Sequence, residues 1–102
     1  MRGLTGRKTP PLWRMKAQRL VAHNIRKLRV GRGLSQESLA VDAGIDRTYV
    51  SRLERGLENP TVGVLERIAT ALQSEISSFF VALEPGEEFP APLRGGRKAR
   101  TQ

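Results

Sequence analysis

Residues 35–54 constrain the fold more than any other part of the chain, because two short helical patterns follow one another there with a single glycine between them. Ser35 is a good N-cap for the first helix, and Gly44 is suited to end it, since only glycine enters the left-handed conformation without steric penalty. Asp46 is the expected cap of the next helix, over residues 47–55. Two short helices joined by a tight turn predict a helix-turn-helix unit, with one face of the second helix left exposed.

Three further helical patterns surround this unit. Apolar residues at helical spacing predict a helix from Ala17 to about Arg32, another from Val62 to Leu72 and a short one near Glu75 to Val81. No segment alternates in the manner of a strand. The sequence therefore predicts an all-α fold of five helices, and its 102 residues have room for a single core.

Proline, glycine and basic residues gather at both ends of the chain. We expect residues 1–16 to form a flexible basic arm, residues 17–85 the helical domain and residues 86–102 a flexible basic tail. The arginine-rich, acid-free start also resembles a transit peptide, and Met15 is an alternative start of the chain.

The overall charge narrows the classes of function. A net charge of +8 favours an anionic partner, of which nucleic acid is the first candidate and an acidic membrane surface the second. No apolar run is long enough to span a bilayer, so we expect no membrane partner. The chain has no cysteine, one histidine (His23) and no nucleophile–base pair or phosphate-binding loop, so we expect no metal, no cofactor and no enzymatic activity.

The second helix of the predicted unit has an exposed face that suits nucleic acid. Arg47, Thr48 and Arg52 lie away from Val50 and Leu53, which we expect to be buried. Arginine bonds bidentately to guanine O6 and N7, and threonine bonds a base or touches a thymine methyl group. These three residues are therefore the predicted base contacts.

Several short motifs occur together between about Asn24 and Phe80. They are Gly33-Leu34-Ser35-Gln36-Glu37, the pair Leu39-Ala40, the run Ser51-Arg52-Leu53-Glu54-Arg55-Gly56 followed by Asn59-Pro60, and Ile68-Ala69-Thr70-Ala71-Leu72. In combination this stretch resembles the Cro and phage-repressor type (XRE family) of helix-turn-helix domain. The resemblance implies a five-helix, lambda-repressor-like domain in which the second and third helices form the DNA-binding unit. Gln73 and Ser74 replace the Gly-Val pair usual in the family, so we expect this corner to differ.

The resemblance also assigns roles to particular residues. Contacts to the DNA backbone would come from Gln36, Tyr49, Ser51 and Arg55. Arg29 and Glu54 would form a structural ion pair. The family often builds its dimer from the last helix, and the candidate interface residues are Ile76, Phe79, Phe80, Val81 and Leu83.

The leading hypothesis is a sequence-specific regulator of transcription that binds double-stranded DNA as a homodimer, in the cytoplasm and associated with the nucleoid. A controller of a restriction-modification system is one setting for such a small domain. The alternatives left open are an antitoxin, with a protein toxin as partner, and a protein-interaction adaptor on the same fold. A protein partner such as a toxin or a polymerase also remains open.

Overall fold

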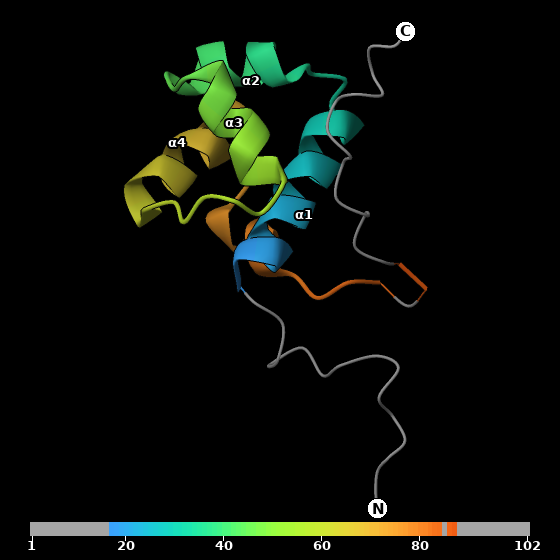
Figure 1. Cartoon of the computed structure of the whole chain (residues 1–102). Coiled ribbons are helices and arrows are strands. Elements are labelled where there is room, and N and C mark those ends of the chain that lie inside the picture. The colour runs from blue at the N-terminus through green and yellow to red at the C-terminus, as the bar shows by residue number, and fades with distance from the viewer. Residues whose placement is uncertain (1–16, 85, 88–102) are drawn as a thin grey trace, which may run out of the picture.

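The computed structural model describes residues 17–84 and 86–87, so the predicted arm and nearly all of the predicted tail lie outside the described residues. The described part contains four α-helices, one 3-10 helix and no strand (Figure 1). The elements in chain order are α1 (Ala17–Gly31), α2 (Gln36–Ala43), α3 (Arg47–Glu54), α4 (Val62–Ala71) and η3 (Ile76–Phe80).

The helical class predicted from the sequence is confirmed, but the fifth element is not an α-helix. Residues Ile76–Phe80 form a 3-10 helix, whose N-cap Glu75 makes no side-chain cap hydrogen bond. Five residues without such a cap are too few to sustain the α-helical ladder, and the tighter 3-10 form is common in short segments. The expectation of five α-helices is therefore corrected to four α-helices and one 3-10 helix.

Capping side chains start the three helices after α1, and two of them, Ser35 and Asp46, are the caps predicted from the sequence. The Ser35 hydroxyl accepts from the Ser38 N–H, and the Asp46 carboxylate accepts from the Thr48 N–H at 3.0 Å. The Thr61 hydroxyl begins α4 in the same way. Each bond satisfies one of the backbone donors left free at a helix start, which explains why these elements begin where they do.

The core lies where α1, α3, α4 and η3 meet beneath α2. Its fully buried residues come from every element: Ile25, Leu39, Val50, Ile68, Leu72 and Phe79 are each 0% exposed. α2 packs on α3 and α4, whereas α1 packs on α3 and η3. Figure 1 shows the consequence, with α2 and α3 at one end of the domain and η3 beside α1 at the other.

A buried asparagine fastens η3 to α1. Asn24 is 6% exposed, and its amide nitrogen donates to the carbonyl oxygens of Phe79 at 2.9 Å and Val81 at 3.0 Å. These bonds satisfy carbonyls at the end of η3 that the short helix leaves unpaired. At the preceding corner Gln73 adopts a left-handed conformation with φ of 53°, at the position where glycine is usual in the resembled family.

Candidate nucleic-acid interface

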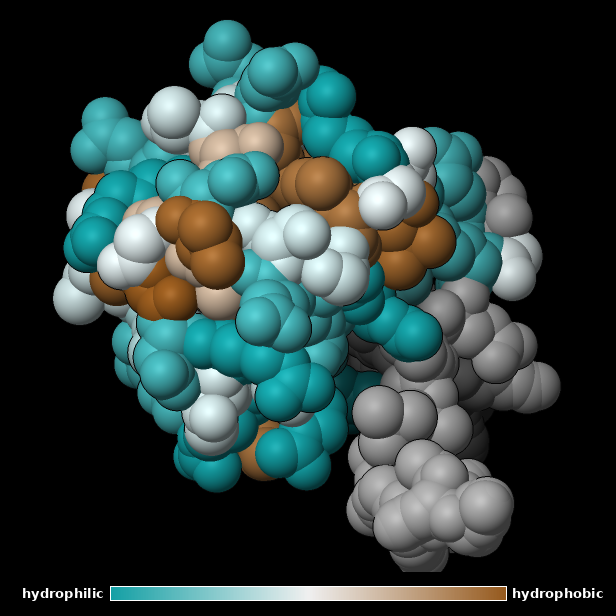
Figure 2. Space-filling model, turned by 90° about the horizontal axis from the view of Figure 1, so that it is seen from above, coloured by the Kyte–Doolittle hydropathy of each residue, from teal (hydrophilic) through white to brown (hydrophobic). Residues whose placement is uncertain are grey.

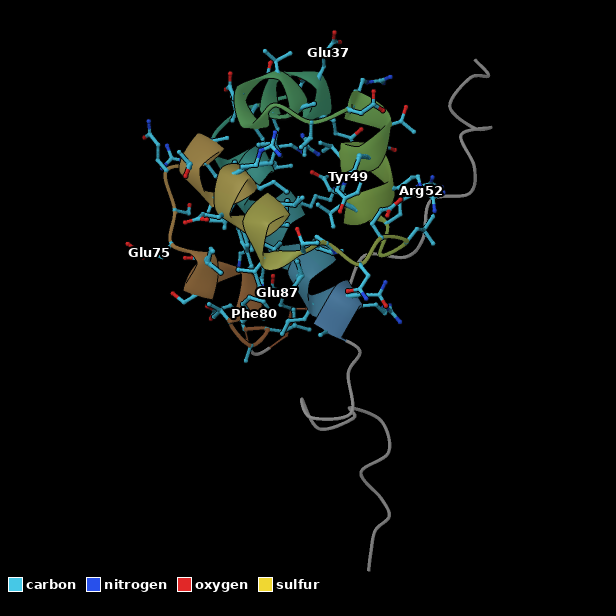
Figure 3. The ribbon with its side chains drawn as sticks, turned by 90° about the vertical axis from the view of Figure 1, so that its left-hand side faces the viewer. Glu37, Tyr49, Arg52, Glu75, Phe80 and Glu87 are labelled. Carbon is cyan, nitrogen blue, oxygen red and sulfur yellow. The ribbon has the colours of Figure 1, made fainter. Side chains whose placement is uncertain are left out.

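α3 is buried along one side and exposed along the other. Val50 and Leu53 attach it to the core. The exposed side carries the three predicted base contacts together with one predicted backbone contact, namely Arg47, Thr48, Arg52 and Arg55. The other predicted backbone contacts, Gln36, Tyr49 and Ser51, are half-buried. Figure 3 shows Arg52 on the side of the domain away from Glu75 and Phe80, with Tyr49 between Arg52 and the middle of the domain.

An ion pair holds the inner side of α3 to the rest of the domain. Arg29 of α1 donates from Nε to Glu54 Oε2 at 2.6 Å and from Nη2 to Oε1 at 2.9 Å. The two side chains are 12% and 2% exposed. A third donor of Arg29, Nη1, bonds the Leu34 carbonyl at 2.7 Å. This two-pronged, nearly buried contact fixes the end of α3 against α1 and the segment before α2.

Gln36 belongs to the same network, which the sequence did not indicate. Its Nε2 donates to Glu54 Oε1 at 3.1 Å. An amide nitrogen carries two donor hydrogens, so this bond orients the side chain and leaves one donor available. Gln36 therefore links the start of α2 to the end of α3.

A second ion pair lies on the outer side of α3. Arg52 Nε donates to Glu58 Oε2 at 2.7 Å, and Arg52 Nη2 lies 3.4 Å from the Leu57 carbonyl oxygen. These side chains are 45% and 28% exposed, so water reaches both. Sequence reasoning missed Glu58, because it lies beyond the turn at Gly56, where helical spacing no longer predicts which side chains meet.

Tyr49 lies between the core and the exposed face of α3. Its ring packs against the core cluster and is half-buried. Burial raises the pKa of the Tyr49 hydroxyl, and the negative charge of Glu58 adds to the effect. Like any tyrosine hydroxyl at neutral pH, it carries a proton and can donate a hydrogen bond.

The residues proposed for a dimer interface divide into buried and exposed ones. Phe79 is 0% exposed in the core of its own subunit, so its inclusion in an interface is wrong. Phe80 and Val81 are 45% and 52% exposed, whereas Ile76 and Leu83 are half-buried. The sequence could not separate Phe79 from Phe80, because either of two adjacent aromatic residues could face the core of a short helix.

The last described residues contact α1. Glu87 accepts from His23 Nε2 at 2.5 Å, from Lys27 Nζ at 3.4 Å and from the Glu84 N–H at 2.8 Å. The Glu84 N–H and His23 are the main causes that lower the pKa of Glu87 to about 2. Glu87 thus attaches the segment after η3 to the first helix.

The rest of the described surface is mostly polar. Viewed from the α2 end, the surface is largely hydrophilic, with separate apolar areas between polar side chains (Figure 2). Within residues 17–84 and 86–87, no three His, Cys, Asp or Glu side chains gather as metal ligands. No helix in the same part of the chain is both long and apolar enough to cross a bilayer.

Two capped helices at a tight turn, the second exposed and basic, define a helix-turn-helix protein. The helix-turn-helix family HTH_3, of XRE type, matches residues 25–79, which is more than half of the chain. The chain belongs to this family.

Named relatives and solved structures agree with this membership. A hypothetical transcription factor of Neisseria meningitidis is 41% identical over 68 residues, which are 67% of this chain and 62% of the relative. The match therefore spans less than two thirds of that relative. Control protein C.SmaI of Serratia marcescens is 37% identical over 62 residues, covering 61% of this chain and 74% of the relative.

Two restriction-modification controllers have similar folds. The structure of C.AhdI from Aeromonas hydrophila has a TM-score of 0.61 and 40% identity, over 62% of this chain and 96% of that one. The C.Esp1396I tetramer in complex with its natural 35-base-pair operator has a TM-score of 0.60 and 36% identity, over 65% of this chain and 87% of that one.

Proposed function

We propose that the chain regulates transcription by binding specific double-stranded DNA sequences, with α3 inserted in the major groove. The observation that carries this proposal is the exposed row of Arg47, Thr48 and Arg52 on a helix whose inner side is anchored by the Arg29–Glu54 pair. A rigidly held helix with donors on its free face fits base recognition, because base edges are distinguished by the position of hydrogen-bonding groups. The similar C.Esp1396I forms a complex with its natural operator, which supports DNA as the partner.

The proposed contacts fall into two groups. Arg47, Thr48 and Arg52 contact base edges and supply specificity. The positioning contacts to phosphate come from Gln36, Tyr49, Ser51 and Arg55. Gln36 suits this role because its bond to Glu54 orients the amide while one donor hydrogen remains. The Tyr49 hydroxyl suits it because it is a hydrogen-bond donor between the core and the exposed face of α3.

We further propose a symmetric homodimer. Phe80 and Val81 are both exposed, and Figure 3 shows Phe80 at the end of the domain opposite Glu37 of α2. Half-buried Ile76 and Leu83 complete the proposed surface. A two-fold arrangement would place two α3 helices in successive major grooves, with half-sites about 34 Å apart.

Restriction-modification control is the proposed biological setting, supported by the controllers C.SmaI and C.AhdI among the similar proteins. The proposed activity is binding to DNA at the nucleoid, with no catalytic step and no cofactor.

Selection of bound duplexes from a random pool, at low and at moderate salt, tests the proposed function. We expect a palindromic consensus that persists at both salt concentrations, because base contacts survive when phosphate contacts weaken. Binding that falls steeply with salt and yields no consensus would overturn sequence-specific regulation. A consensus without two-fold symmetry would overturn the dimer alone.

A further inference from the structure

The two arginines of α3 differ in their surroundings. Arg47 and Arg52 are both exposed. Of the two, only Arg52 has a side-chain partner within the described part of the chain, the carboxylate of Glu58. That carboxylate occupies Nε of Arg52 at 2.7 Å. Nη2 also lies 3.4 Å from the Leu57 carbonyl oxygen, but it carries a second hydrogen. The donors of Arg52 left for a ligand are therefore those on its terminal nitrogens, Nη1 and Nη2.

This restriction has a consequence for base recognition. A guanidinium can present either the edge formed by Nε and one terminal nitrogen or the edge formed by both terminal nitrogens. Because Glu58 occupies Nε, only the second edge is free to meet O6 and N7 of a guanine as a pair of donors. Glu58 therefore limits Arg52 to one geometry of approach.

Glu58 is itself held in place. Its carbonyl oxygen accepts from Nε2 of Gln18 at 3.0 Å, which ties the segment after α3 to the first turn of α1. Its carboxylate faces α3, where it accepts from Arg52 Nε at 2.7 Å. Its negative charge also helps to raise the pKa of the Tyr49 hydroxyl. An acid beside a DNA-binding helix repels phosphate, so its presence here is explained best by its action on Arg52.

We propose that Glu58 is a positioning residue that sets the base specificity of Arg52, directing its terminal nitrogens to one guanine in each half-site. This inference rests on the proposed DNA-binding function. Glu58 has a second effect, because it offsets the charge of Arg52 and so lowers affinity for DNA of unrelated sequence.

The test compares wild type with Glu58→Gln, Arg52→Ala and the double variant, in the full chain. Fluorescence anisotropy measures binding to the selected consensus duplex, to duplexes with each base substituted and to a random duplex at two salt concentrations. Arg52→Ala identifies the base pair that Arg52 contacts. At that pair we expect Glu58→Gln to lower the preference for guanine by about 3- to 10-fold, while the affinity for random DNA rises by about 2- to 5-fold.

Glu37→Gln is the matched control. Glu37 is an exposed acid in the first turn of α2, at the same end of the domain (Figure 3). Its substitution removes the same charge without touching Arg52, so random-DNA affinity should rise and base preference should stay unchanged. In the Arg52→Ala background, Glu58→Gln should cause no further loss of guanine preference, because its effect passes through Arg52.

A measurement without DNA checks the contact itself. In NMR spectra of the free protein, the Arg52 Nε–H signal should shift and exchange faster with water in Glu58→Gln, but not in Glu37→Gln. Equal exchange in wild type and Glu58→Gln would overturn the proposal. Full guanine preference in Glu58→Gln would also overturn the proposed role of Glu58, but the proposed DNA-binding function would stand. Failure of the wild type to bind any duplex at low salt would overturn both.

Discussion

The inner and outer sides of α3 each carry an arginine–glutamate pair, and the two pairs have nearly the same length but different surroundings. Arg29 and Glu54 meet at 2.6 Å with side chains 12% and 2% exposed. Arg52 and Glu58 meet at 2.7 Å with side chains 45% and 28% exposed. Distance alone therefore does not say what an ion pair does. The buried pair cannot exchange its partner without leaving an unpaired charge, whereas the exposed pair can turn toward a ligand.

Arg29→Ala should give the largest effect. It leaves the nearly buried Glu54 carboxylate without its partner, and we expect the free energy of unfolding to fall by about 3–5 kcal/mol. Urea denaturation followed by circular dichroism measures this loss. The matched control is Arg52→Ala, which should cost less than about 1 kcal/mol because the pair is solvated. Equal losses in the two variants would remove the distinction between the pairs.

The exposed arginine, Arg52, should act on DNA binding through a direct contact. Arg52→Ala should cost about 1–3 kcal/mol on the consensus duplex and less on random DNA, because a base contact is lost. Anisotropy titrations on both duplexes provide the comparison. An equal loss on specific and random DNA would mean that Arg52 contacts phosphate only.

Glu87 offers a third acid–base contact, at the opposite end of the domain. Its pKa is lowered from 4.5 to about 2, mainly by the Glu84 N–H and His23. A carboxyl group whose pKa is lower in the folded than in the unfolded chain stabilises the fold at pH values above its unfolded pKa. This contribution is lost as the pH falls toward 2. Glu87→Gln should therefore be less stable than wild type at pH 7.

This difference between Glu87→Gln and wild type should close as the pH falls from about 4.5 to about 2. Thermal unfolding of both proteins across that range measures it. A difference that is the same at pH 7 and pH 2.5 would show that the charge of Glu87 makes no contribution.

Gln73→Gly should have the smallest effect on stability. It serves as a reference because Gln73 takes no part in the contacts of Glu54, Glu58 or Glu87. Gln73 has a φ of 53°, a conformation that strains residues with a Cβ atom. Glycine relieves that strain but has more conformational entropy to lose on folding, so we expect a gain of at most about 1 kcal/mol. Urea denaturation measures the change, and a loss of stability would contradict the argument.

The regular elements were predictable because their signals are local. Three expected helices, 17–32, 47–55 and 62–72, each end one residue earlier than expected, at Gly31, Glu54 and Ala71. The starts of α2, α3 and α4 follow from capping side chains within three residues of the bonded N–H. The attachment of η3 to α1 was not predictable, because it depends on Asn24, far away in the sequence.

The sequence by itself determined the capped helices and the exposed row on α3, because caps and helical periodicity act over a few neighbouring residues. Only the tertiary structure decided which side chains meet at the two ion pairs. Gln36 bonds Glu54 of the buried pair, and Glu58 meets Arg52 after the chain turns at Gly56. The tertiary structure also decided that Phe79 fills the core while Phe80 stays exposed. These outcomes depend on how distant segments pack, and packing geometry is not encoded in local spacing.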